Sequence, residues 1–190
     1  MNSIADRIQD RELKRRMLQN RVRRAIRLNL PELLPDYLKM LLGTVVGFGI
    51  VTFLLRRFTD VDPLWVLAGV ALAYSLRAGY YKLKLAADPG YTIPKCGCAG
   101  AVNDRTEVVL QSTYSKLLGV PNAVLGATLY IALLVAVHMQ QHSAATALAL
   151  VALIGSAYLG YAMVVKIAAL CPTCVTIAGL NLLILWQLLG

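Results

Sequence analysis

The chain has 190 residues, of which 58% are hydrophobic and 15% are charged, with a mean hydropathy of +0.62 and a formal net charge of +9. Soluble domains contain about 45–50% apolar and about 25% charged residues, so this composition excludes an ordinary soluble domain and, more firmly, a disordered chain. The positive charge is local, because nine of the 19 basic residues lie in the first thirty positions.

The first segment, residues 1–35, is predicted to be a basic amphipathic arm. Its apolar positions are spaced by four or five residues, with lysine and arginine between them: Ile4, Ile8, Leu13, Met17, Val22 and Ile26. This pattern predicts a helix on an anionic membrane surface, where each cation contributes about 1 kcal/mol. A solvated charged helix or a nucleic-acid-binding arm is the alternative. The apolar stretch that follows favours the membrane, so no nucleic-acid partner is expected.

Five stretches approach the length of about 20 apolar residues that a helix needs to cross a bilayer. They are residues 37–55, 64–81, 120–139, 144–165 and 168–189. The second is the weakest candidate because Arg77 lies inside it and must reach the interface or face other helices. We therefore expect an all-α integral membrane fold with five transmembrane helices and one long hydrophilic loop, residues 82–119.

The distribution of lysine and arginine predicts the orientation of the five spans. The side that holds the N-terminus and the long loop collects sixteen basic residues, whereas the other side collects Arg56 and Arg57 alone, next to Asp60 and Asp62. Basic residues concentrate on the cytoplasmic side of membrane proteins. The N-terminus and the loop are therefore predicted to be cytoplasmic, in a cell inner membrane, with the C-terminus outside.

The four cysteines form two close pairs, and the second pair begins the last span as Cys171-Pro172-Thr173-Cys174. A spacing of three residues places both sulfurs on one face of a first helical turn, and Pro172 is well tolerated at a helix start. Such a pair is a plausible redox couple that opens and closes as a disulfide. The alternative is two buried cysteines that act as small apolar residues.

The first pair, Cys96 and Cys98, lies in the hydrophilic loop as Cys-Gly-Cys. This pair can exchange disulfides with Cys171 and Cys174 at the membrane surface. Alternatively, four thiolates would make a closed structural zinc site. A Cys-x-Cys spacing is tighter than zinc sites usually have, which favours the relay, and no metal is assigned.

His138 and His142 are four residues apart at the end of the third span, a spacing that can bind a metal on one helix face. They lie on the side opposite the cysteines and have no carboxylate neighbours. Polar residues at the membrane interface are the favoured interpretation.

Residues 98–190 resemble the four-helix core of the vitamin K epoxide reductase family, whose members are membrane enzymes that oxidise protein thiols and pass the electrons to a quinone. Three stretches carry the resemblance: Ser112 to Pro121, Gly126 to Tyr130, and Cys171 to Thr176 with Asn181. With the preceding span, the resemblance covers roughly residues 64–189.

The resemblance implies a role for several residues. Cys171 and Cys174 would face the quinone, with Cys174 the more direct contact, and Ser112 matches the hydroxyl residue of the family's loop. Three further residues match positions that line the quinone pocket: Asn122, Gly126 and Tyr130. Asn122 would donate a hydrogen bond to a quinone carbonyl, and its alternative role is a helix N-cap after Pro121.

The chain departs from the family pattern in the loop. The family has two loop cysteines eight positions apart, the second of them six positions before the serine; here Cys98 takes the first position and Thr106 the second. Threonine cannot exchange disulfides, so Cys96 is expected to substitute, or the chain keeps the fold without turnover. A cytoplasmic loop is also unusual, because most members face an oxidising compartment.

The expected organisation is the arm at 1–35, an additional transmembrane helix and turn at 36–62, and a four-helix domain of the family type at 63–190 with its cysteine loop at 82–119. The expected function is a thiol-disulfide oxidoreductase coupled to quinone reduction, with menaquinone, ubiquinone or a similar quinone and a thioredoxin-like or other thiol protein as electron donor. The alternative is a non-catalytic subunit of a larger quinone-using membrane complex.

Overall fold

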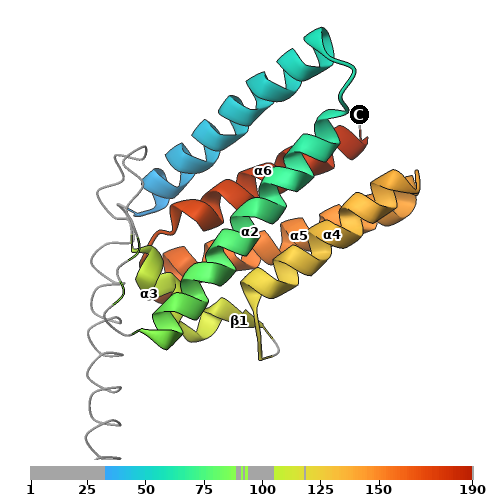
Figure 1. Ribbon diagram of the computed structural model, residues 1–190. Helices are drawn as coiled ribbons and strands as arrows, with labels where there is room; N and C mark the ends of the chain where they lie inside the picture. The colour runs from blue at the N-terminus through green and yellow to red at the C-terminus, as the bar shows by residue number, and fades with distance from the viewer. Residues whose placement is uncertain (1–32, 89–90, 92, 94–104, 118, 190) are drawn as a thin grey trace, which may run out of the picture.

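The structure is a computed structural model that describes residues 33–88, 91, 93, 105–117 and 119–189. The amphipathic arm and both loop cysteines, Cys96 and Cys98, lie outside the described residues, so the predictions for them stay predictions. Within the described part, the chain is dominated by long helices (Figure 1).

The long helices are Leu33–Phe58, α2 (Pro63–Ala87), α4 (Asn122–His138), α5 (His142–Tyr161) and α6 (Pro172–Leu189). Shorter elements connect them: α3 (Thr106–Gln111), the 3-10 turn η1 (Thr113–Ser115), strands β1 (Lys116–Leu117) and β2 (Val120–Pro121), and the π-helical turn η2 (Ala162–Ile167). The two strands pair antiparallel, with Lys116 opposite Pro121 and Leu117 opposite Val120. The turn between them contains Gly119 at a φ of +82°, which glycine adopts without steric cost.

Three helical segments in the described ranges are long and apolar enough to cross a membrane: Leu33–Phe58, the continuous stretch His142–Ile167, and Pro172–Leu189. Helix α4 is apolar but shorter. Helix α2 is long, but it carries Arg77, Lys82 and Lys84. The prediction of long apolar helices is thus confirmed.

Several helix boundaries differ from the predicted ones. Helix α2 continues to Ala87 because the lysines that end its apolar stretch are good helix formers. The last helix begins at Pro172, so the predicted start at residue 168 is wrong. Ala168 adopts the left-handed conformation at a φ of 51°, which ends the preceding helical turn.

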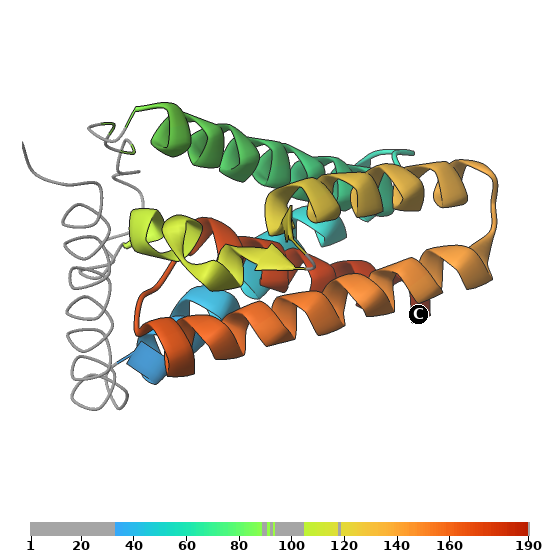
Figure 2. The same ribbon diagram turned by 90° about the horizontal axis from the view of Figure 1, so that it is seen from below.

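Helices α2, α4, α5 and α6 pack in a ring, in which each helix contacts two neighbours: α2 with α4, α4 with α5, α5 with α6, and α6 with α2. Figure 2 shows the hairpin and α3 at the end of this ring where α6 begins. The core of the ring is formed by large aliphatic residues and close-packed alanines: Leu64, Leu67, Ala68, Ala71, Leu133, Ala145, Ala149, Leu180, Leu183 and Ile184. Small side chains allow the helix backbones to approach closely.

A buried polar network joins three of these helices. The Tyr130 hydroxyl of α4 donates to Asn181 Oδ1 of α6 at 2.8 Å. Asn181 Nδ2 in turn donates to Ser156 Oγ at 2.7 Å and to the carbonyl of Ala152 at 3.2 Å, both on α5. Because an unpaired polar group in an apolar interior is costly, this network specifies how α4, α5 and α6 are aligned.

Candidate active site

The start of α6 brings the two cysteines of the Cys-Pro-Thr-Cys motif together. The sulfurs of Cys171 and Cys174 lie 2.7 Å apart. The backbone N–H of Cys174 donates to Cys171 Sγ at 3.3 Å, so this sulfur caps one of the amides that the first turn of a helix leaves unpaired. The predicted proximity of the two cysteines on one helical turn is therefore present in the structure.

The two thiols differ in accessibility. Cys171 is 0% exposed and lies in an apolar cluster with Val109 of α3 and Val175 of α6, completed by Met163, Ile167 and Ala169. Cys174 is partly exposed and packs against the same cluster. Cys174 is thus the member of the pair that a second reactant can reach more easily.

The segment around α3 covers this cluster and is fixed to the helices by hydrogen bonds. The backbone N–H of Arg105 donates to the carbonyl of Leu170, the residue before Cys171, at 3.0 Å. Glu107 accepts from the backbone N–H of Ile93 at 3.0 Å. Thr106 is buried at the first position of α3, directly after this anchor. Thr106, which the resemblance matches to a cysteine position, therefore lies beside the chain segment that leads into the dithiol.

A lysine of α2 holds the segment that follows α3. Lys82 Nζ donates to the carbonyl of Ser115 at 2.9 Å and to its hydroxyl at 2.5 Å. Lys82 lies beyond the predicted apolar span 64–81. Burial, together with the nearby ammonium of Lys116, lowers the pKa of Lys82 below its ordinary value.

Two predicted site residues, Ser112 and Asn122, are each hydrogen-bonded to a residue that packs in or against the cysteine cluster. The Ser112 hydroxyl donates to the carbonyl of Val109 at 2.7 Å, and Val109 packs in the cysteine cluster. Asn122 Nδ2 donates to the carbonyl of Tyr114 at 2.7 Å, and Tyr114 also packs against that cluster. The Asn122 side chain makes no N-cap bond to α4.

The side-chain oxygen of Asn122, Oδ1, is buried and has no hydrogen-bond partner among the described residues. A buried acceptor without a partner costs about 1–3 kcal/mol, so a donor at this position would be stabilising. The structure therefore leaves an acceptor open at Asn122, while one of its two N–H groups is already used.

Gly126 and Tyr130 lie further along α4. A Cβ at Gly126 would lie 3.1 Å from Ser75 Oγ, so this glycine lets α2 approach α4 closely. Tyr130 is 2% exposed and its hydroxyl is bonded to Asn181. Neither residue belongs to the cysteine cluster, and their predicted role toward a quinone stays a prediction.

Tyr37 also lies at the dithiol, and sequence reasoning assigned it no role. It comes from the helix Leu33–Phe58 and packs against the cysteine cluster. The available signal was its spacing with Met40, Leu41 and Thr44, which places all four on one helix face. In a mostly apolar helix, however, that spacing does not distinguish a packed face from a lipid-facing one.

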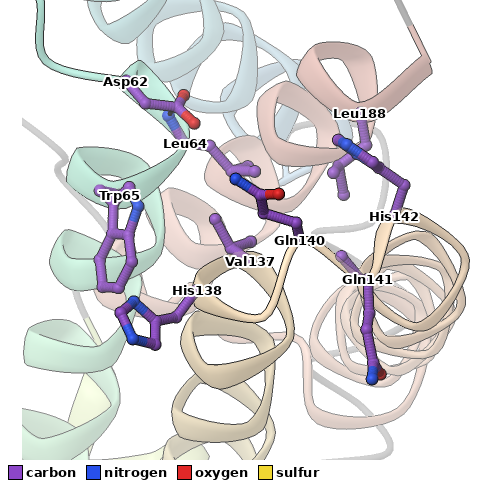
Figure 3. Close-up of a pocket in the computed structure, with 10 residues that line it drawn as sticks. Asp62, Leu64, Trp65, Val137, His138, Gln140, Gln141, His142 and Leu188 are labelled. Carbon is purple, nitrogen blue, oxygen red and sulfur yellow. Dashed lines mark hydrogen bonds between the residues drawn. The ribbon is translucent and has the colours of Figure 1, made fainter.

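A cavity of about 360 Å³ lies at the opposite end of the helices, around the turn between α4 and α5 (Figure 3). Its lining includes Asp62, Trp65, His138 and His142, and the rings of Trp65 and His138 meet edge to face at 6.2 Å. Leu188 at the end of α6 also lines it, which places the cavity about 25 Å from Cys171 at a rise of about 1.5 Å per residue. No group of three metal-binding side chains occurs in the described ranges.

The dithiol at the start of α6 and the segment around α3 that covers it fall within one recognised sequence domain. The model of the vitamin K epoxide reductase family matches residues 63–189. The chain belongs to this family. Comparison with curated proteins gave no match. The long apolar helices and the family together identify an integral membrane protein, and family membership points to thiol-disulfide and quinone chemistry. The helix Leu33–Phe58, with Tyr37, precedes the matched domain.

Proposed function

We propose that this family member is a membrane thiol oxidoreductase that forms disulfides in a partner protein and passes the electrons to a quinone. The observation that carries the proposal is the Cys171–Cys174 pair. Its sulfurs lie 2.7 Å apart, with Cys171 buried and Cys174 accessible, inside the family domain. This arrangement suits a dithiol that becomes a disulfide without moving the helix that carries it.

The electrons balance as a sequence of two-electron exchanges. A reduced thiol protein, for example of the thioredoxin type, reduces a disulfide between Cys96 and Cys98 and itself becomes a disulfide. The resulting loop dithiol reduces the Cys171–Cys174 disulfide by thiol-disulfide exchange. Oxidation of the Cys171–Cys174 dithiol then releases two electrons and two protons, and a bound quinone supplies the acceptor for them.

Asn122, at the start of α4, is bonded to a residue that packs against the cysteine cluster, and its side chain carries an open acceptor. We assign Asn122, Gly126 and Tyr130 to the quinone pocket and Ser112 to the loop that covers it. The open Oδ1 of Asn122 supports this assignment, because the hydroxyl of a quinol can donate to it and the second N–H of the same amide can donate to a quinone carbonyl. Menaquinone and ubiquinone both carry the oxygens that this amide would recognise.

The proposed placement in the membrane has five spans, formed by Leu33–Phe58, residues 64–81 of α2, α4, α5 with η2, and α6. The arm and the cysteine loop face the cytoplasm, and the C-terminus lies outside a cell inner membrane. The proposed domains are the arm at 1–35, the additional helix at 36–62 and the family domain at 63–190. Thiol labelling of intact and permeabilised cells tests the orientation, since labelling of Cys96 and Cys98 from outside intact cells contradicts it.

The catalytic proposal is tested on the purified full-length protein in nanodiscs, with a dithiol as reductant and a soluble quinone as acceptor. Cys174→Ser and Cys171→Ser should each abolish quinone reduction, whereas Thr173→Ser, which changes the residue between them, should retain it. Quinone reduction that persists in both cysteine variants contradicts the proposal. Elemental analysis of the same preparation tests the four-thiolate zinc alternative.

A second candidate function is a non-catalytic subunit of a larger quinone-using membrane complex. The observation that favours it is Thr106, which occupies the family's second loop-cysteine position and is buried at the start of α3. The two candidates differ in one measurement. A stable isolated protein that reduces quinone excludes the subunit, whereas cysteines that keep one redox state with and without quinone support it.

A further inference from the structure

The helix Leu33–Phe58 precedes the family domain and packs on it along one face. The packed side chains recur every three or four residues: Tyr37, Met40, Leu41, Val45 and Phe48. Side chains of the opposite face, including Leu38 and Leu42, are exposed. The beginning of this helix meets the end of the domain where α6 starts, because Leu33 packs with Ala168 and Leu170 (Figure 1).

This helix packs against two glycines of the family domain. A Cβ at Gly160 of α5 would lie 2.5 Å from the Tyr37 hydroxyl and 3.1 Å from the ring carbon that bears it. A Cβ at Gly179 of α6 would lie 2.8 Å from Thr44 Cγ2. Both separations are too short for a real side chain, so only glycine permits this approach. The helix is thus held close to both α5 and α6, and Tyr37 is the residue that meets α5.

Tyr37 lies at the accessible cysteine. Its ring packs against the apolar cluster that contains Cys171 and Val175, and Cys174 packs against the same cluster. Leu33 packs with Leu170 and Thr44 meets the Cβ position of Gly179, so this helix runs alongside α6 and Tyr37 lies level with its first turn. The Tyr37 ring therefore lies beside the partly exposed thiol of Cys174, on the face of the family domain against which the additional helix packs.

We propose that Tyr37 is a positioning residue and a wall of the dithiol site, whose ring covers one side of Cys174 and thereby slows its reaction with small water-borne thiols and alkylating agents. The inference rests on the proposed function in one respect, because that function makes Cys174 the reactive thiol. With this wall in place, Cys174 exchanges with the covering loop and the quinone in preference to small thiols of the surroundings. The redox site is then completed by a residue outside the matched domain.

The experiment measures the rate at which N-ethylmaleimide alkylates Cys174 in the reduced full-length protein in nanodiscs, with the modified cysteine identified by mass mapping. Tyr37→Ala should raise this rate, because it removes the ring that shields one side of the partly exposed thiol. Tyr37→Phe keeps the ring and should stay within about twofold of the wild type. Leu38→Ala removes a large side chain from the lipid-facing side of the same helix and should change nothing.

A second variant displaces the Tyr37 ring without shortening the Tyr37 side chain. Gly160→Ala places a methyl group against the Tyr37 hydroxyl and should displace the ring, raising the alkylation rate of Cys174. Adding Tyr37→Phe removes the atom that the methyl group meets and should restore the slow rate. This rescue is not expected if Gly160→Ala merely disrupts the fold.

An unchanged rate in Tyr37→Ala, or an equal rise in Tyr37→Phe and Tyr37→Ala, overturns the inference. Alkylation needs no quinone, so the two proposals fail separately. If quinone reduction depends on Cys174 but the alkylation rate of Cys174 is the same with and without the Tyr37 ring, only the role proposed for Tyr37 is rejected. Faster alkylation in Tyr37→Ala, in a protein that never reduces quinone, rejects the proposed function alone.

Discussion

The hydroxyl of Tyr130 donates a 2.8 Å hydrogen bond to Asn181 in the interior of the helix ring, and the same asparagine donates to Ser156. One side chain of α6 thereby satisfies polar groups from α4 and α5. The bond also gives Tyr130 a structural role besides its proposed place at the quinone pocket.

Asn181→Leu should lower the free energy of unfolding by about 2–4 kcal/mol, because it leaves the hydroxyls of Tyr130 and Ser156 without their partner in an apolar interior. Thermal unfolding in detergent measures the change. Leu182→Ala, at the neighbouring and partly lipid-exposed position, is the control for disturbing α6 and should cost less.

Tyr130→Phe separates the structural role from the pocket role. Loss of the hydrogen bond alone should cost about 1 kcal/mol and leave the KM for quinone unchanged. If Tyr130 also contacts the quinone, the KM for quinone rises in addition to this loss of stability. Steady-state quinone reduction and thermal unfolding of one preparation decide between the two.

Thr106→Cys should place a thiol beside the dithiol and form a disulfide with Cys171 or Cys174. Thr106 follows Arg105, whose backbone is bonded to the residue before Cys171, so the new sulfur starts close to the pair. Mass mapping under non-reducing conditions detects the bond. Gln111→Cys, at the exposed end of α3, should not cross-link, and a bond formed equally well there contradicts the placement of α3.

Gly179→Ala should destabilise the protein by about 1–3 kcal/mol, because the added methyl group meets the β-branched side chain of Thr44 on the additional helix. Thr44→Ala removes the nearer methyl group and should recover part of the loss. Gly155→Ala is the matched control, since nothing lies within 4 Å of its Cβ position and alanine favours the helix. Unfolding temperatures of the wild type, Gly179→Ala, Gly155→Ala and the Gly179→Ala/Thr44→Ala double variant test this contact.

The lowered pKa of Lys82 predicts a pH effect on stability. Its folded pKa lies below its ordinary value, so between the two the unfolded chain binds more protons and the free energy of unfolding rises with pH. Lys82→Met should remove this rise and also weaken the attachment of Ser115. Chemical unfolding at a series of alkaline pH values measures the difference in slope, and equal slopes contradict the shifted pKa.

The sequence predicted the parts of this protein that depend on local pattern. Long apolar stretches indicated the helices, and the spacing of Cys171 and Cys174 indicated two sulfurs on one turn. Boundaries were less predictable where charge and helix propensity disagree, as at Lys82 and Lys84, which end an apolar stretch but not the helix. The left-handed Ala168 had no signal, because glycine or asparagine usually occupies such positions.

Helix packing was harder to predict for a physical reason. In a membrane helix both faces are apolar, so hydrophobic periodicity does not show which face meets protein and which meets lipid. Tyr37 and Leu38 are neighbours in the sequence, yet Tyr37 packs against the cysteine cluster and Leu38 is exposed. The glycines that receive the helix, Gly160 and Gly179, became informative only with their partners in place.

The hydrogen bond from the Cys174 amide to Cys171 Sγ links the oxidation state of the pair to the N-terminal end of α6. A reduced sulfur accepts from this amide, whereas a sulfur in a disulfide shares its electrons with a second sulfur and is a weaker acceptor. Oxidation therefore releases a backbone N–H at the positive end of the helix dipole. Hydrogen exchange at that single amide would then follow the redox cycle and provide a readout that needs neither quinone nor thiol reagent.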